Sequence, residues 1–170
     1  PCANARRTIH SSPMPSTLFT LGYEKRSLSD YLAILLESEV EVVLDVRETA
    51  WSHKPGFSKT ALARALGDVG IEYVHVAFAG NPKWLRREAT THRECIENFA
   101  HYLAAMPQIS VRLGEVIAEV GVTGRSIALT CFERHHEDCH RSILADAWAA
   151  QGYRSVEHLA IDGCPRLIRA

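Results

Sequence analysis

The segment Asp45-Val46-Arg47 places a carboxylate and a guanidinium two residues apart. On an extended strand, this spacing puts both charged side chains on the same face. A neighbouring guanidinium keeps a carboxylate ionised, and arginine binds carboxylates and phosphates through two parallel hydrogen bonds. The segment therefore predicts an anion-binding position, with Asp45 as a catalytic group and Arg47 as the substrate-binding group. A structural ion pair at a strand end is the alternative.

The densest polar cluster of the chain runs from Cys131 to Arg141, with the sequence Cys-Phe-Glu-Arg-His-His-Glu-Asp-Cys-His-Arg. Cys131 and Glu133 repeat the two-residue spacing. Cys139, His140 and Arg141 fall in the first turn of a predicted helix, where free N–H groups and the helix dipole favour anions and lower the pKa of a thiol. The cluster predicts a catalytic thiolate at Cys139 or a phosphate held by Arg141. The alternative for Cys131 is a buried thiol that only packs.

Zinc is another interpretation of the same cysteines and histidines. The available ligands would be Cys131, Cys139, His140 and one of His135 or His136. The spacing C-x7-C-H differs from the usual zinc fingers and ribbons, and the chain has no second CxxC pair. We therefore expect no cofactor and no metal ligands, and zinc stays the minor alternative.

Two loops combine aromatic and basic side chains of the kind that stack on a base and hold a phosphate. The first runs from Trp51 to Lys59 and includes Ser52, and the second carries Trp84 beside lysine and arginine. Tyr23 follows the first predicted strand. We expect Tyr23, Ser52 and Lys59 to contribute to substrate binding. An ordinary surface loop with an aromatic anchor is the alternative for each loop.

These residues need a scaffold, and the chain alternates strand and helix patterns. Strands are predicted at 18–21, 40–46, 71–78, 126–132 and 155–161, and helical apolar stripes lie between them. The pattern predicts a single-domain α/β fold with a mainly parallel, doubly wound sheet of about five strands, Rossmann-like or flavodoxin-like, flanked by helices. Ligands bind beyond the carboxyl ends of such strands. Because the two polar segments end the second and fourth strands, we expect them on one rim.

Bulk properties narrow the class of protein. The chain has 170 residues and a formal net charge of −1, which fits one domain and gives no global attraction to nucleic acid or anionic membranes. It has five cysteines, an odd number without a disulfide pattern, and this indicates reduced thiols in a cytoplasm. No apolar run is long enough for a membrane helix. Residues 1–16 are predicted to be a disordered arm and residues 17–170 the domain.

Several segments together resemble the DUF488 family, a bacterial and archaeal family of unknown function. They cover residues 18–160 in the order Phe19-Thr-Leu-Gly-Tyr-Glu24, Leu44-Asp-Val-Arg47, Ser52-His-Lys-Pro-Gly-Phe-Ser-Lys59, Gly70-Ile-Glu-Tyr-Val-His75, Ala79-Gly-Asn-Pro82 and Cys131-x-Glu133…Cys139-His-Arg141. The resemblance implies a compact cytosolic α/β domain without an established reaction. One departure is His53, which stands where the family has arginine and weakens a phosphate-binding role for that loop.

The residues and the resemblance lead to one functional hypothesis with two alternatives. The hypothesis is an enzyme, a hydrolase or transferase, that acts on a phosphate-bearing nucleotide or nucleic-acid component. Its catalytic residues would be Asp45, Glu133, Cys139 and His140, and its substrate-binding residues Tyr23, Arg47, Ser52, Lys59, Cys131 and Arg141. The alternatives are a cysteine-dependent redox protein and a non-catalytic module that binds nucleotides or nucleic acid. We expect a small-molecule or nucleotide-like ligand and no membrane partner, and the oligomeric state stays open.

Overall fold

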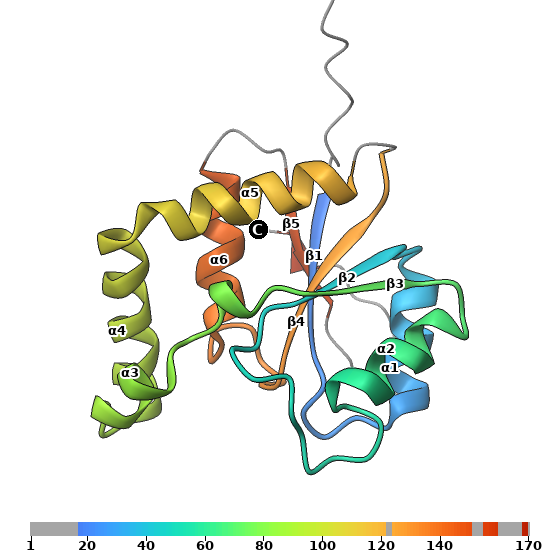
Figure 1. Cartoon of the computed structure of the whole chain (residues 1–170), viewed down its shortest axis with the longest axis horizontal. Helices are drawn as coiled ribbons and strands as arrows, with labels where there is room; N and C mark the ends of the chain where they lie inside the picture. Colours follow the sequence, from blue (N-terminus) through green and yellow to red (C-terminus); the bar gives the residue numbers. More distant parts are fainter. Residues whose placement is uncertain (1–16, 122–123, 151–154, 160–167, 170) are drawn as a thin grey trace, which may run out of the picture.

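A six-stranded β-sheet forms the centre of the molecule in the computed structural model, which describes residues 17–121, 124–150, 155–159 and 168–169 (Figure 1). The strand order is β3-β2-β4-β1-β5-β6, and all neighbouring pairs are parallel except β5 with β6. The strands are β1 (Thr17–Gly22), β2 (Val42–Asp45), β3 (Glu72–His75), β4 (Ile127–Cys131), β5 (Ser155–His158) and β6 (Ile168–Arg169). This confirms the predicted α/β fold with a mainly parallel sheet. The predicted arm, residues 1–16, lies outside the described residues.

Helices cover both faces of the sheet (Figure 1). Tyr31 and Leu66 belong to the apolar cluster on the face of α1 and α2, whereas Phe99, Leu113 and Trp148 belong to the cluster on the face of α4, α5 and α6. None of the helices in the described ranges is long and apolar enough to cross a membrane. The helices are α1 (Leu28–Glu37), α2 (Lys59–Gly67), the 3₁₀ helix η1 (Ala77–Ala79), α3 (Lys83–Glu88), α4 (His92–Ala105), α5 (Pro107–Val120) and α6 (His140–Ala149).

Local sequence signals explain where several elements begin. Ser27 and Asp30 form a capping box at the start of α1, in which Ser27 Oγ accepts from the Asp30 N–H at 3.0 Å and Asp30 Oδ2 accepts from the Ser27 N–H at 3.3 Å. The β-branched run of β2 is buried along its whole length, as expected for a strand covered on both faces. The predicted loop that carries Trp84 instead contains α3, which buries Leu85.

The order of the strands creates a switch point beside β4. The connections from β1 and β2 run through α1 and α2 on one face, whereas β4 continues into α6 on the other face. Neighbouring strands whose chains leave in opposite directions open a crevice at their carboxyl ends, where α/β proteins bind ligands. In the familiar nucleotide-binding sheets, the first two strands are neighbours. Here β4 lies between them, which places Cys131 beside Gly22 of β1 and one step beyond the Thr130–Asp45 pair with β2.

Candidate functional site

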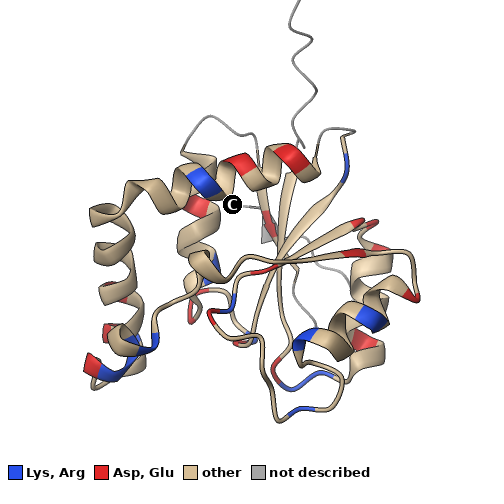
Figure 2. Cartoon of the chain, in the orientation of Figure 1, with Lys and Arg blue, Asp and Glu red and all other residues tan. Residues whose placement is uncertain are grey.

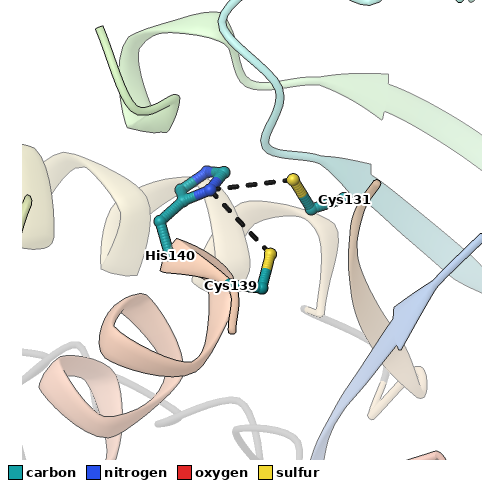
Figure 3. Close-up of side chains that lie close together, drawn as sticks. All are labelled: Cys131, Cys139 and His140. Atoms are coloured by element: carbon teal, nitrogen blue, oxygen red, sulfur yellow. Dashed lines mark hydrogen bonds between the residues drawn. The ribbon is translucent and has the colours of Figure 1, made fainter. Parts of the chain in front are cut away.

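Two thiols and an imidazole meet where β4 ends and α6 begins (Figure 3), and the carboxylate of Glu133 lies against both thiols. Cys131 is the last residue of β4, Cys139 is the N-cap of α6, and His140 is the first residue of that helix. Cys139 Sγ donates to Glu133 Oε2 at 2.8 Å, and Cys131 Sγ donates to the same oxygen at 3.3 Å. His140 Nδ1 lies 3.6 Å from Cys131 Sγ and 4.0 Å from Cys139 Sγ. We call Cys131, Glu133, Cys139 and His140 the β4–α6 cluster.

The orientation of the His140 ring is fixed by the backbone of the residue that follows β2. His140 Nε2 lies 2.9 Å from the carbonyl oxygen of Val46. Since a carbonyl only accepts hydrogen bonds, Nε2 carries the proton, and the lone pair of the neutral imidazole is on Nδ1. The ring also packs edge-on against Phe99, with 5.0 Å between ring centroids. The basic nitrogen of His140 therefore faces the two sulfurs.

The buried groups of the cluster shift one another's proton affinities. Burial, followed by the charge of Cys139, raises the pKa of Glu133 to about 7. Burial alone would raise the pKa of Cys139, but its contacts with Cys131 and His140 and the charge of Arg141 hold it well below its ordinary value. The hydrogen bond to Cys139, followed by burial, raises the pKa of Cys131. Of the two thiols, Cys139 therefore loses its proton more readily than Cys131.

Asp45 and Arg47 form a buried ion pair in the wall beside the cluster. Arg47 Nε donates to Asp45 Oδ1 at 2.8 Å, and Nη2 donates to Oδ2 at 2.5 Å. Arg47 Nη1 donates to Tyr23 Oη at 2.7 Å and to the Phe57 carbonyl at 2.9 Å. Tyr73 Oη donates to Asp45 Oδ2 at 2.7 Å. The contacts of this guanidinium are made within the protein, and the geometry matches the structural ion pair.

Arg141 ties down the loop that connects β4 to α6. Its side chain is 1% exposed, and it donates from Nη1 to the Glu133 carbonyl at 2.6 Å and from Nη2 to the Arg134 carbonyl at 3.2 Å. Gly22 lies directly below this loop, since a Cβ added there would be 1.7 Å from the Glu133 carbonyl oxygen. Arg141 and Gly22 together set the position of the Glu133 backbone, and with it the cluster.

The cluster opens into a pocket of about 590 Å³ at the carboxyl edge of the sheet. Cys131, Glu133 and His140 line its base, and Tyr23 and Arg47 line its wall. Cys139 is fully buried beneath this base. The mouth carries exposed or half-buried aromatic and polar side chains, which include Trp51, Ser52, His53, Lys54, Arg86, His92 and Phe132. The volume lies in the range of small-molecule sites.

Of the two remaining residues that were expected to bind substrate, Ser52 lines the pocket and Lys59 does not. The Oγ of Ser52 accepts from the Lys54 N–H at 3.1 Å. Lys59 is the first residue of α2, where its N–H donates to the Ala50 carbonyl at 2.7 Å.

Sequence reasoning overlooked several residues that line the pocket. Lys54 donates from Nζ to the Tyr23 carbonyl at 3.0 Å, and Arg86 pairs with Glu48 at 3.0 Å. Both belong to the two aromatic and basic loops, so the composition of those loops was the available signal. Asn81 and His92 also line the pocket, and no local pattern marks them.

The structure also brings together a group that can hold a metal ion. Within the described residues, the ligand atoms of Cys131, Cys139 and His140 lie within 4.8 Å of one another, and all three side chains are buried. Neutral imidazole and deprotonated thiols are zinc ligands. The spacing along the chain, which argued against fingers and ribbons, says little about ligands supplied by a strand end and a helix start.

Together, the fold and the site define a doubly wound α/β protein with a candidate site at the carboxyl edge of its sheet. The family model of DUF488, a domain of unknown function, matches residues 27–148. The chain therefore belongs to the DUF488 family, which confirms the resemblance seen in its motifs. No curated protein and no solved structure matches the chain.

Proposed function

We propose that the protein is an enzyme that acts on a small molecule bound in the 590 Å³ pocket, with the reaction at the β4–α6 cluster. One observation carries this proposal: Cys131, Glu133 and His140 come from a strand end, a loop and a helix start, and they converge at the base of an open pocket. A core gains more from apolar packing than from such groups, because buried polar side chains must recover their lost hydration. A catalytic role explains why they are assembled here.

The position of each residue in the site indicates its role in the proposed reaction. Glu133 lines the pocket and accepts from both thiols, so its carboxylate is within reach of a bound molecule and of the groups below. We assign it as the general acid or base. His140 is held by the Val46 carbonyl, so Nδ1 is its reactive nitrogen. The Asp45–Arg47 pair, which flanks Val46, acts as a positioning element.

The pocket mouth supports an anionic, phosphate-bearing substrate. Lys54 makes one hydrogen bond to a backbone carbonyl, and an ammonium has three protons to donate. Arg86 stands at the same mouth, and the exposed rings of Trp51 and Phe132 provide surfaces for a base. Basic residues on α3 and in the loops below the sheet lie among acidic ones (Figure 2). This arrangement favours a single nucleotide or sugar phosphate over a long nucleic acid.

A substrate screen with a matched pair of variants tests the proposal. Nucleotides, sugar phosphates and other phosphomonoesters are first ranked by the rise in melting temperature they cause, and the binders are then followed for products by mass spectrometry. We expect conversion by the wild type and by Glu137→Gln, which changes an exposed carboxylate of the same loop, and loss of conversion by Glu133→Gln. A panel without binders refutes the substrate class. Binders that the wild type leaves intact support a non-catalytic binding module instead.

A further inference from the structure

The geometry points to a zinc site in the β4–α6 cluster, with Cys131 Sγ, Cys139 Sγ and His140 Nδ1 as ligands and the fourth position open to the pocket. We propose this ion as the cofactor of the reaction described above, so its catalytic meaning rests on the proposed function. Binding of the ion itself is independent of any substrate and is measured without one.

The distances from His140 Nδ1 to the two sulfurs are close to those around one tetrahedral ion. With Zn–S near 2.3 Å and Zn–N near 2.0–2.1 Å, a sulfur and a nitrogen on the same zinc are about 3.6 Å apart. His140 Nδ1 lies 3.6 Å from Cys131 Sγ and 4.0 Å from Cys139 Sγ. Both thiols donate their protons to Glu133, so the lone pair on His140 Nδ1 faces two sulfurs that have no proton left for it. A cation between the three atoms would satisfy this lone pair and both sulfurs at once.

The surroundings of His140 and Cys139 suit bound metal. Histidine ligands usually donate their second ring nitrogen to a carbonyl or carboxylate, which fixes the tautomer. His140 makes such a contact with the Val46 carbonyl at 2.9 Å. Cys139 is the N-cap of α6, which holds its sulfur at the first turn of that helix. Two thiolates and a divalent zinc sum to no net charge, which lowers the cost of burying them.

Glu133 fits the role of a neighbour better than that of a ligand. Its Oε2 lies 2.8 Å from Cys139 Sγ, whereas an oxygen and a sulfur on one tetrahedral zinc are about 3.6 Å apart. The fourth position is then left for water or substrate on the side of the pocket. Zinc lowers the pKa of bound water to about 7, and a carboxylate beside it can take the proton. Three protein ligands and an open position are typical of catalytic zinc.

The donor set also selects the metal. Two thiolates and an imidazole suit zinc and other soft or borderline metals, whereas magnesium and calcium take oxygen ligands.

Metal content is the direct test. The protein is purified under reducing conditions without chelator, incubated with one equivalent of zinc chloride, desalted, and analysed by mass spectrometry of the elements. We expect about one zinc per chain for the wild type and for Cys95→Ser, and about one-tenth of that or less for Cys139→Ser and His140→Ala. Cys95 is the matched control because it is a free thiol outside the cluster. Circular dichroism establishes that each variant is folded.

A second measurement covers the case in which the ligand variants do not fold. Wild-type protein is alkylated with iodoacetamide with and without zinc, and the modified cysteines are mapped by peptide mass. Zinc is expected to protect Cys131 and Cys139 and to leave the reaction of Cys95 unchanged. Wild-type protein that retains no zinc, or in which zinc protects neither Cys131 nor Cys139, overturns the inference. A Cys131–Cys139 disulfide that persists in protein purified under reducing conditions also overturns it and favours the redox alternative.

The outcomes separate this inference from the proposed function. If zinc is absent but Glu133→Gln abolishes turnover, the enzyme proposal stands without a metal. If zinc binds and no pocket ligand is converted, the metal site stands and the enzyme proposal fails.

Discussion

Replacement of Gly22 by alanine tests how the β4–α6 loop is held over the sheet. The added Cβ would lie 1.7 Å from the Glu133 carbonyl oxygen and 2.7 Å from its carbon, both backbone atoms. Because these atoms cannot swing away as a flexible side chain can, the loop itself must move. The φ of Gly22 is not in the left-handed region, so the contact alone causes the penalty.

The hydrogen bonds around Gly22 set the size of the expected loss in the free energy of unfolding. Moving the Glu133 carbonyl breaks the hydrogen bond from Arg141 Nη1 at 2.6 Å, and the displaced loop strains those from the Tyr23 N–H to the Cys131 carbonyl at 3.2 Å and from the Glu24 N–H to the Phe132 carbonyl at 2.8 Å. A hydrogen bond from a charged donor contributes about 1.5–3 kcal/mol and a neutral one about 1 kcal/mol, so the loss of all three amounts to about 3.5–5 kcal/mol. For a chain of this size, the melting temperature should fall by roughly 7 to 20 °C.

Urea denaturation followed by circular dichroism measures this loss in free energy of unfolding. Gly67→Ala is the matched control, since a Cβ at this helical position meets nothing within 4 Å, and alanine should be neutral or slightly stabilising there. A Gly22→Ala protein that unfolds at the same urea concentration as the wild type would refute the packing argument.

Three further predictions concern the ion pair, the pH dependence and the pocket mouth. Asp45→Asn leaves the buried charge of Arg47 without its partner, and we expect a loss of about 3–5 kcal/mol in the free energy of unfolding, measured by urea denaturation. Burial, followed by the charge of His136, lowers the pKa of His158 to about 4, below its unfolded value of 6.5. The stability that this group contributes is therefore present above pH 6.5 and is lost as the pH falls towards 4. We expect a loss of about 1 kcal/mol in the free energy of unfolding after allowance for the partial exposure of His158, and this loss should vanish in His158→Gln. Lys54→Ala should weaken binding of a phosphate-bearing ligand about tenfold, whereas Lys59→Ala should leave the dissociation constant unchanged, as isothermal titration calorimetry can show. Equal changes in the dissociation constant for the two lysine substitutions would contradict the placement of the phosphate group at Lys54 in the pocket mouth.

Local patterns predicted the elements because helices and buried strands depend on neighbouring residues. The capping box at Ser27 and the apolar run of β2 each carry their own signal, and both elements form as expected. The six-residue helix α3 was not predicted, because it buries Leu85 alone and therefore shows no repeated apolar spacing. The strand order was beyond reach, since the insertion of β4 between β1 and β2 depends on packing between segments about 100 residues apart in sequence.

The site was predictable in place but less so in detail. Period-two spacing and the carboxyl-end rule brought Cys131 and Glu133 to the rim, where they meet the start of α6. The expected anion-binding roles of Arg47 and Arg141 rested on residue type alone. Their partners include the carbonyls of Phe57 and Glu133, which only the folded chain brings within reach. A spacing rule for zinc fingers likewise cannot describe ligands supplied by separate elements.

Anomalous diffraction at the zinc absorption edge, from crystals of zinc-reconstituted protein, tests the central claim most directly. The claim predicts one peak about 2.3 Å from Cys131 Sγ and Cys139 Sγ and about 2.0–2.1 Å from His140 Nδ1, with its fourth position open to the pocket beside Glu133. A map without a peak at this point, or with the ion held by surface residues only, would contradict the claim.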